Sequence, residues 1–268
     1  MDRAWQLAPG VVVRASRGSP EAGALAEIFP AFEVVAPEGT PRLTTHVRGD
    51  GALRVSLDGQ ALFSVADDEL APALEAALIG WVVRTRAGVV PLHASALAWA
   101  GRAVLFLGDK GSGKSTLAAQ LGAALPYLGD EIAFVRIPDL VLAPFPKAAT
   151  IKHGAFAVLP ASPGSRTWRD PLRGPVRYHE PAVTSRAELP AGALVWPQWS
   201  ADVKAATMAP LARAEVALRL IHQSFGGLER DPRTLDVIVA LSARPAFELA
   251  YATAGAARAA LEEALGPP

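Results

Sequence analysis

The stretch GDKGSGKST, residues 108–116, places glycines, a lysine and a hydroxyl residue at the spacing G-x-x-x-x-G-K-S. Glycines allow the backbone to turn so that successive N–H groups face phosphate oxygens. Lys114 supplies a mobile cation for the β and γ phosphates, and Ser115 supplies a hydroxyl that can bind Mg²⁺. The sequence therefore predicts an ATP and Mg²⁺ site. Its expected nucleotide-binding residues are Gly108, Asp109, Lys110, Gly111, Ser112, Gly113, Lys114, Ser115 and Thr116.

The segments on either side of this loop match the elements that such a site requires. AVLFL before the loop is an apolar run of strand length, and STLAAQLGAAL after it has a helical pattern without proline. The start of that helix adds the positive end of its dipole to the loop. Upstream, PLHASALAWAGRAVLFLG predicts two strands around a turn at Ala100 and Gly101. A strand, a loop and a helix thus follow one another in the expected order.

An acidic pair in YLGDEIAFV is the candidate for acid–base and metal chemistry. A helix from Lys114 to about residue 124 carries the chain roughly 16 Å from the loop at about 1.5 Å per residue. Residues 125–130, if extended, return a similar distance at about 3.3 Å per residue. Asp130 and Glu131 are therefore expected at the phosphate end of the sheet, the alternative being an exposed acidic turn.

His93 lies 15 residues before Gly108, on a strand expected to neighbour the loop strand. One interpretation is that it orients the catalytic acid near pH 7. The other is a satisfied core histidine, which the spacing alone favours.

Composition excludes several classes of function. The chain has 268 residues, 51% of them hydrophobic, and a formal net charge of +0, which provides no basic field for nucleic acid. Cysteine is absent, so a disulfide framework or a thiol nucleophile is impossible. The most apolar run, ALEAALIGWVVRTRAGVV, contains Glu75, Arg84 and Arg86, and the N-terminus lacks the apolar core of a signal peptide. We expect a cytoplasmic protein without a membrane span.

Two domains are predicted, with a boundary near Ala87–Val90. Residues 1–88 are expected to form a strand-rich lobe from VVVRAS, FEVVAP and RLTTHVRGDGALRVSLDGQALFSV, with hairpin turns at RGDG and LDGQ. The lobe ends in a helix, DELAPALEAALIGWVVRT, for which Asp68 is the expected cap. Residues 89–268 form the nucleotide-binding domain.

The segment from about 160 to 200 is rich in proline, glycine and arginine and predicts a long loop. Its arginines either meet a phosphate or an acidic substrate or belong to a solvated loop; they are Arg166, Arg169, Arg173 and Arg177. Beyond it, the pattern predicts helices over about 210–224 and 232–243, a strand at FELAYA and a last helix from about 254.

LHASALAWAGRAVLFLGDKGSGKSTLAAQL followed by LGDEIAFV resembles the catalytic domain of HPr kinase/phosphorylase and related bacterial serine kinases, including kinases of lasso-peptide precursors. The resemblance is specific over about residues 91–136. It implies an α/β P-loop fold of the phosphoenolpyruvate-carboxykinase-like type. It also implies His93 as a supporting histidine, Asp130 as the base on the acceptor hydroxyl and Glu131, with Ser115, as a metal ligand.

APFPKAATIKHGAF is similar to a segment of the peptide-kinase relatives, which places Lys147 or Lys152 at the phosphates or the acceptor unless they are surface lysines. Arg173 and Arg177 complete the candidate substrate contacts. Three departures stand out: the second acid is glutamate where the family usually has aspartate, the pair comes about one residue early, and residues 1–88 are unlike the HPr kinase N-terminal domain. The last argues against HPr as substrate. HPr kinases assemble as hexamers, which leaves a homo-oligomer open, although no feature here indicates one.

The resulting hypothesis is an ATP-dependent serine kinase acting on a peptide or small protein, with Lys114, Asp130 and His93 as catalytic residues. Two alternatives remain: a small-molecule kinase for free serine or a sugar-like alcohol, and a regulatory module that binds ATP without transferring phosphate. The first would have a closed site. The second would be indifferent to Asp130→Asn.

Overall fold

A computed structural model describes residues 2–8, 11–35, 39–161, 165–226 and 231–268. The fold is mixed α/β with several sheets, in agreement with the α/β part of the predicted fold class. The chain forms two compact units: unit 1 contains Met1–Ala87 and Thr150–Glu180, and unit 2 contains Gly88–Ala149 and Pro181–Pro268. The predicted domains, 1–88 and 89–268, were each continuous along the chain, whereas unit 1 also takes up a segment from the middle of the sequence.

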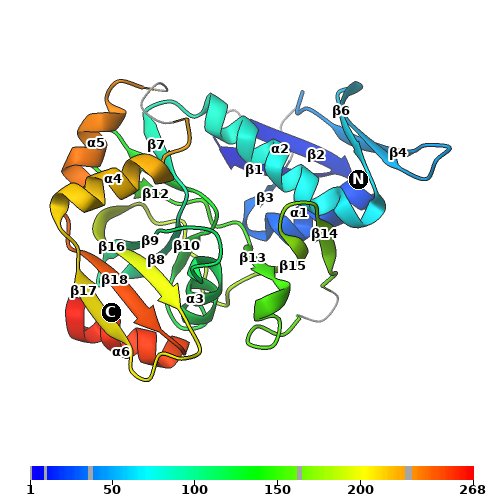
Figure 1. The fold of residues 1–268 in the computed structure, drawn as a ribbon. Coiled ribbons are helices and arrows are strands. Elements are labelled where there is room, and N and C mark those ends of the chain that lie inside the picture. The colour runs from blue at the N-terminus through cyan, green and yellow to red at the C-terminus, as the bar shows by residue number, and fades with distance from the viewer. Residues whose placement is uncertain (1, 9–10, 36–38, 162–164, 227–230) are drawn as a thin grey trace. The chain divides into compact units, whose positions relative to one another are not determined.

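Unit 1 contains three small sheets, visible in blue, cyan and green in Figure 1. The first has the order β2-β1-β3 and is made of β1 (Asp2–Ala8), β2 (Val11–Ser16) and β3 (Glu33–Val34). The second is the meander β4 (Leu43–Val47), β5 (Leu53–Leu57) and β6 (Gln60–Val65), whose antiparallel pairs confirm the predicted hairpins. The third has the order β13-β15-β14, with β13 (Ala149–Lys152), β14 (Trp168–Asp170) and β15 (Gly174–His179). Part of the predicted strand FEVVAP lies outside the described residues.

Two helices accompany these strands. Helix α1 (Pro20–Ile28) was not predicted, although Ser19 caps it by accepting from the Ala22 backbone N–H at 3.3 Å and proline occupies its first position. Helix α2 (Leu70–Thr85) was predicted, and it buries Leu70, Leu74 and Leu78 on one stripe. Short 3₁₀ helices occur at Pro30–Phe32, Asp67–Glu69 and His153–Ala155.

The predicted cap of α2 was wrong. Glu69 occupies the N-cap position, but its side chain does not cap α2 and instead accepts from the Ala66 N–H at 3.3 Å, because a 3₁₀ turn precedes the helix and displaces its start. Asp68 instead pairs with Arg169 at 3.1 Å.

The prediction of a long loop over 160–200 was also wrong for about half of its length, which forms strands. Strands β14 and β15 pair in register from Trp168↔Val176 to Asp170↔Gly174, and β16 (Leu189–Trp199) is a long strand of unit 2. Proline and glycine are depleted in strands, and their frequency here indicated a loop. Strands β14 and β15 pair with each other across a short turn, whereas β16 pairs with β9, β12 and β18, which are distant in sequence. The segment therefore supplies structure to both units.

Unit 2 is built on a sheet with nine strands in the described residues, ordered β10-β8-β9-β16-β12-β11-β7, with β18 beside β16 and β17 beside β18. Strands β9, β16 and β18 are parallel, and the remaining pairs are antiparallel. The strands not yet given are β7 (Val89–Leu92), β8 (Ser95–Trp99), β9 (Arg102–Phe106), β10 (Tyr127–Gly129), β11 (Ala133–Arg136), β12 (Val141–Ala143), β17 (Thr207–Pro210) and β18 (Ala246–Tyr251).

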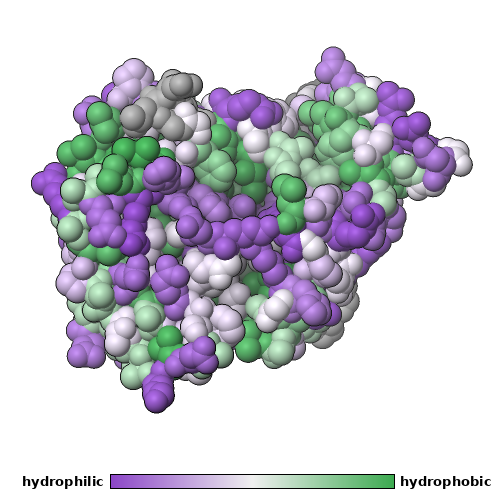
Figure 2. Space-filling view, viewed as in Figure 1, coloured by the Kyte–Doolittle hydropathy of each residue, from purple (hydrophilic) through white to green (hydrophobic). Residues whose placement is uncertain are grey.

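The helices of unit 2 are α3 (Lys114–Leu121), α4 (Arg213–Gln223), α5 (Thr234–Leu241) and α6 (Ala254–Leu265). Their positions confirm the pattern predicted for the end of the chain and for the helix after the loop. Val216, Leu220 and Ile238 of α4 and α5 join the buried core of the sheet. The other side of these two helices carries exposed Leu218 and Val239, where Figure 2 shows hydrophobic residues gathered.

No helix within the described ranges has the length and apolar character needed to cross a membrane.

Candidate functional site

The glycine-rich loop connects the end of β9 to the start of α3, as predicted. Gly108, Gly111 and Gly113 have φ angles of 125°, 95° and 98°, in the region that side chains disfavour. Backbone of this kind can form a concave nest of N–H groups, and the eight-residue helix that follows adds its positive end. The loop can therefore receive an anion such as phosphate.

Gly113 could not be replaced by another residue without rearrangement. A Cβ atom there would lie 2.3 Å from the Tyr251 hydroxyl and 3.2 Å from Cβ of Trp199. Tyr251 donates from its hydroxyl to the Gly113 carbonyl at 3.3 Å. Burial raises the pKa of Tyr251, so the hydroxyl keeps its proton at neutral pH and remains a donor. Tyr251, the last residue of β18, thus contacts the loop and helps to hold its conformation.

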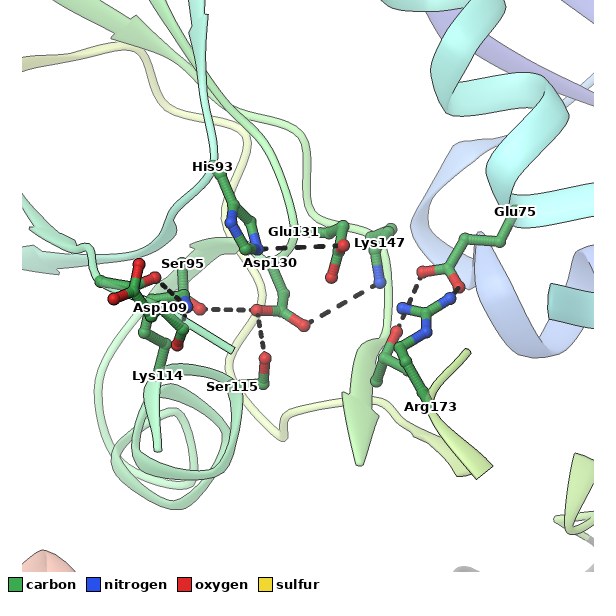
Figure 3. A network of polar contacts seen from close by, with 12 residues as sticks. Glu75, His93, Ser95, Asp109, Lys114, Ser115, Asp130, Glu131, Lys147 and Arg173 are labelled. Carbon is green, nitrogen blue, oxygen red and sulfur yellow. Dashed lines mark hydrogen bonds and ion pairs between the residues drawn. The ribbon is translucent and has the colours of Figure 1, made fainter. Parts of the chain in front are cut away.

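Lys114 is folded over the loop that precedes it. Its buried ammonium group donates to the carbonyl of Gly108 at 2.5 Å and to the carbonyl of Asp109 at 3.0 Å (Figure 3). Both acceptors are neutral carbonyls, so a phosphate could compete for the same cation.

The other loop residues differ in their environment. Asp109, Lys110 and Gly111 are exposed, and Thr116 is partly buried on α3. The Ser112 hydroxyl is buried and has no hydrogen-bond partner within the described part of the chain. A buried polar group in this state is costly, which is consistent with a loop shaped to receive a polar ligand.

Asp130 lies directly after β10, where the chain passes very close to another segment. Gly129 has a φ of 154°, and a Cβ atom on it would lie 2.5 Å from the Phe145 carbonyl oxygen. Phe145 in turn donates its N–H to Leu128 at 3.0 Å. This close approach requires glycine and places the segment with Lys147 beside Asp130.

The Asp130 carboxylate is almost completely buried, with 1% of its surface exposed. Its Oδ1 accepts hydrogen bonds from the hydroxyls of Ser95 at 2.5 Å and Ser115 at 2.9 Å (Figure 3). The predicted return of the chain from α3 to the loop is therefore confirmed by a direct contact between Asp130 and the loop serine.

Lys147 supplies the cation of this cluster. Its side chain is fully buried, and its ammonium lies 4.0 Å from Oδ2 of Asp130 and donates to the Ala148 carbonyl at 2.8 Å. Tyr127 holds the backbone by donating from its hydroxyl to the Lys147 carbonyl at 2.9 Å. Lys147 is thus a buried neighbour of the acid and not a surface lysine.

Glu131 points to a different neighbour. Its φ of 68° lies in the left-handed region, which is unusual for a residue with a side chain. Its carboxylate Oε1 lies 3.9 Å from Nε2 of His93, and about a third of each side chain is exposed. The His93 backbone N–H donates to the Gln223 carbonyl at 2.7 Å, and its ring packs against the edge of Phe225. The structure therefore pairs the histidine with the second acid of the pair.

Arg173, a predicted substrate contact, belongs to unit 1 and takes part in a buried network there. It donates to Glu75 at 2.7 Å and to Asp170 at 2.5 Å. The Glu75 carboxylate, 1% exposed, also accepts from the hydroxyls of Thr150 at 2.9 Å and Tyr178 at 3.0 Å. Burial and the neighbouring Glu75 raise the pKa of Tyr178, so its hydroxyl stays a donor.

The two other predicted substrate contacts also lie in unit 1. Lys152 ends β13 and is partly buried. Arg177 places its guanidinium 4.0 Å from the centre of the Phe156 ring and donates to the Thr167 hydroxyl at 2.9 Å. A substrate role for these residues stays a prediction.

Sequence reasoning missed two residues of the site, Ser95 and Tyr251. The prediction that His93 lies on a strand was wrong, because β7 ends at Leu92 and β8 begins at Ser95, which leaves His93 in the connection between them. The strand pattern that starts at Ser95 gave no sign that its hydroxyl contacts Asp130. For Tyr251 no local pattern existed, because its contact joins residues 138 positions apart.

The oxygen ligands of this site suit Mg²⁺. Asp130 and Ser115 offer a carboxylate and a hydroxyl 2.9 Å apart, and Mg²⁺ typically takes one or two protein carboxylates and completes its shell with water and phosphates. In the described ranges no group of three or more His, Cys, Asp or Glu residues could hold a metal alone. Asp130 and Ser115 are the residues of this site that would hold such an ion.

Comparison with protein-family models gave no match, and comparison with curated proteins gave none either.

Proposed function

We propose that this protein is an ATP-dependent phosphotransferase that moves the γ-phosphoryl group of ATP to a serine hydroxyl of a peptide or small protein. The single observation that carries the proposal is the hydrogen bond from Ser115 to Asp130. It joins a glycine-rich loop at a helix start to a buried carboxylate at the end of β10, which is separated from β9 by β8 in the same sheet. P-loop nucleotide-binding sites combine these two parts.

The chain's own residues have separable tasks in this proposal. The loop from Gly108 to Gly113 holds phosphate oxygens through backbone N–H groups. Lys114 exchanges its two carbonyl acceptors for the phosphates and stabilises the charge that develops during transfer. Mg²⁺, when bound, neutralises charge on the β and γ phosphates. Asp130 and Ser115 are the residues that would hold it.

The finer parts of the proposal rest on the sequence resemblance. It supports an HPr kinase-like catalytic domain for unit 2, and it supports a peptide serine as the acceptor. The resemblance also assigns Asp130 as the base and Glu131 as a metal ligand, an assignment that stays a prediction.

The proposal is tested by intact-mass spectrometry of serine-containing peptides encoded beside this gene, incubated with ATP, Mg²⁺ and the protein. Wild type should add one phosphate to a peptide, and Lys114→Ala should lower the rate by about 10³-fold, as removal of an electrostatic catalytic group typically does. Lys204→Ala is the matched control, since that lysine is exposed in the same unit. Equal rates for wild type and Lys114→Ala would contradict the proposal.

A further inference from the structure

Trp199, the last residue of β16, exposes its ring directly beside the glycine-rich loop. All six tryptophans of the sequence lie within the described residues, and Trp199 is the exposed one, at 54%. Its backbone N–H donates to the Ser112 carbonyl at 3.2 Å, and its Cβ lies 3.2 Å from the position that a Cβ on Gly113 would take. A large aromatic side chain therefore lies against the segment that would hold phosphates.

The Trp199 ring is also held in one orientation. Its indole Nε1–H donates at 3.0 Å to the carbonyl of Ala252, the residue after β18. Trp199 pairs with Tyr251 in the register of β16 and β18, and Tyr251 itself donates to the Gly113 carbonyl at 3.3 Å. With its N–H already bonded, the indole offers a ligand its apolar π face.

The strands place this ring beyond the end of the strand that leads into the loop. β9, β16 and β18 run parallel, so their carboxyl ends meet at one edge of the sheet, the edge at which open α/β sheets bind ligands. The last pair of β9 with β16 joins Phe106 to Val195, and β16 then continues to Trp199, a distance of about 13 Å in an extended strand. The loop after β9 thus has the end of β16 along one side.

The order of the strands separates the two ends of a bound triphosphate. Asp130 follows β10, which lies on the β8 side of β9, and Ser115 bonds to it from α3. Trp199 lies on the opposite side, because β16 and β18 follow β9 there. Since Mg²⁺ bridges β and γ oxygens, Asp130 and Ser115 as its ligands would set the γ end on the β10 side. The α-phosphate and the nucleoside attached to it then leave the loop on the side of Trp199.

Resting on the proposed function, we infer that Trp199 binds the nucleobase, which stacks on the exposed face of its indole. The loop holds the phosphates, and Trp199 holds the opposite end of the same ligand. Stacking on an aromatic side chain contributes to the binding of any base, because every base has a π face. A ring that is already fixed also loses little freedom when the base binds, which favours affinity.

The test separates the base from the phosphates by comparing ATP with inorganic tripolyphosphate, which has no base. Calorimetry measures the affinity of both ligands, with Mg²⁺, for wild type, Trp199→Ala and Trp199→Phe. Trp199→Ala should weaken ATP binding by about 5-fold to 150-fold, the range for loss of one base–aromatic stack. Its tripolyphosphate binding should fall by less than about 2-fold. Trp199→Phe keeps an aromatic face and should lose less ATP affinity than Trp199→Ala.

Gln198→Ala is the matched control for these affinities. Gln198 is exposed at the same end of β16, and neighbouring strand residues point to opposite faces of a sheet. Its truncation should leave both affinities unchanged. An ATP loss in Trp199→Ala no larger than its tripolyphosphate loss would overturn the inference, because the residue would then only support the loop. Equal ATP losses in Trp199→Ala and Gln198→Ala would overturn it as well.

Tryptophan emission gives a second readout, which does not depend on catalysis. Stacking of the base should change the emission of wild type when ATP binds. Tripolyphosphate is the control for the buried Trp196, which lies beside Gly108, and it should cause a smaller change. The part of the change that is specific to ATP should disappear in Trp199→Phe. Wild-type emission that responds equally to both ligands would overturn the inference.

The outcomes also separate this inference from the proposed function. A protein that shows these ATP affinities and emission changes but phosphorylates no peptide would support the nucleobase site and contradict the phosphotransferase. Phosphorylation of a peptide together with unchanged ATP affinity in Trp199→Ala would do the reverse. Wild type that binds neither ligand would contradict both.

Discussion

Each of the two units contains a buried carboxylate with a cationic partner, but the two clusters are built differently (Figure 3). Glu75 of unit 1 contacts Arg173 at 2.7 Å and accepts from two further hydroxyls, and Asp170 binds the same arginine. Asp130 of unit 2 lies 4.0 Å from Lys147 and accepts from two serines, one of which belongs to the glycine-rich loop.

Under the proposed function, this difference distinguishes a network that stabilises the fold from one that serves the nucleotide site. In unit 1 two carboxylates bind one guanidinium at short distance, so that charges and hydrogen bonds are matched. These contacts join α2 to the hairpin of β14 and β15. The hydroxyls around Asp130 are weaker partners that a metal ion can replace. Burial alone therefore does not distinguish the two clusters, whereas the kind of partner does.

The largest expected effect is on the stability of unit 1. Glu75→Gln should lower the free energy of unfolding by about 2–3 kcal/mol, because it removes the charge of one of the two buried carboxylates that bind Arg173 and leaves only Asp170. Urea denaturation followed by circular dichroism measures this. Asp139→Asn is the control, since its exposed pair with Arg136 should contribute less than about 1 kcal/mol. A loss below about 1 kcal/mol for Glu75→Gln would show that the network is not structural.

A smaller loss is expected at the corresponding acid of unit 2. Asp130→Asn should lower the free energy of unfolding by about 1–2 kcal/mol, because an amide oxygen can still accept from Ser95 and Ser115 while Lys147 keeps its bond to the Ala148 carbonyl. The same denaturation experiment measures it. If Asp130→Asn lowered the free energy of unfolding as much as Glu75→Gln does, the two clusters would not differ in their contribution to stability.

Two buried tyrosines allow a finer comparison, because each donates one hydrogen bond. The usual net contribution of such a bond to stability is about 1 kcal/mol. Tyr251→Phe removes the donor to the Gly113 carbonyl and should weaken ATP binding several-fold. Tyr178→Phe removes a donor to Glu75 and should lower stability by about the same free energy while leaving ATP affinity unchanged. Titration with a fluorescent ATP analogue measures the affinities. Weaker nucleotide binding in Tyr178→Phe would contradict the separation of roles.

The smallest expected effect concerns strain at Glu131. Relief of a left-handed backbone is worth roughly 1–2 kcal/mol, and the added backbone freedom of glycine costs roughly 0.5–1 kcal/mol. Glu131→Gly should therefore raise the free energy of unfolding by up to about 1 kcal/mol while transfer is lost. A variant that is less stable than wild type would show that the side chain contributes to folding and would weaken the case for a strained functional residue.

The parts of the site that could be predicted from the sequence are those determined by local pattern. The order of β9, loop and α3 follows from one apolar run, three glycines and one helical pattern, and the length of α3 set the return of Asp130 to the loop. The path of the chain from β9 through α3 to Asp130 was therefore predicted correctly from the sequence.

The parts that could not be predicted depend on pairing between distant segments. Ser95 meets Asp130 only because β8 and β10 pair with a shifted register between Tyr127 and Gly129. Segment 150–180 joins unit 1 through β15 and through the pairing of Arg173 with Glu75, and neither is visible in a stretch rich in proline and glycine. The direction of the Glu131 side chain depends on one backbone angle, which the residue type does not predict.

The central claim is that Asp130 serves the nucleotide site while Glu75 serves the fold. The most direct test compares how far ATP with Mg²⁺ raises the unfolding temperature of wild type, Glu75→Gln and Asp130→Asn, each against ATP with EDTA. At a ligand concentration of about 100 times Kd, binding stabilises the folded state by about 2.7 kcal/mol. The account predicts that Mg²⁺ raises the unfolding temperature of Glu75→Gln as much as that of wild type, although the variant unfolds at a lower temperature without Mg²⁺. For Asp130→Asn it predicts no Mg²⁺-dependent rise. A full rise in Asp130→Asn, or its loss in Glu75→Gln, would contradict the account.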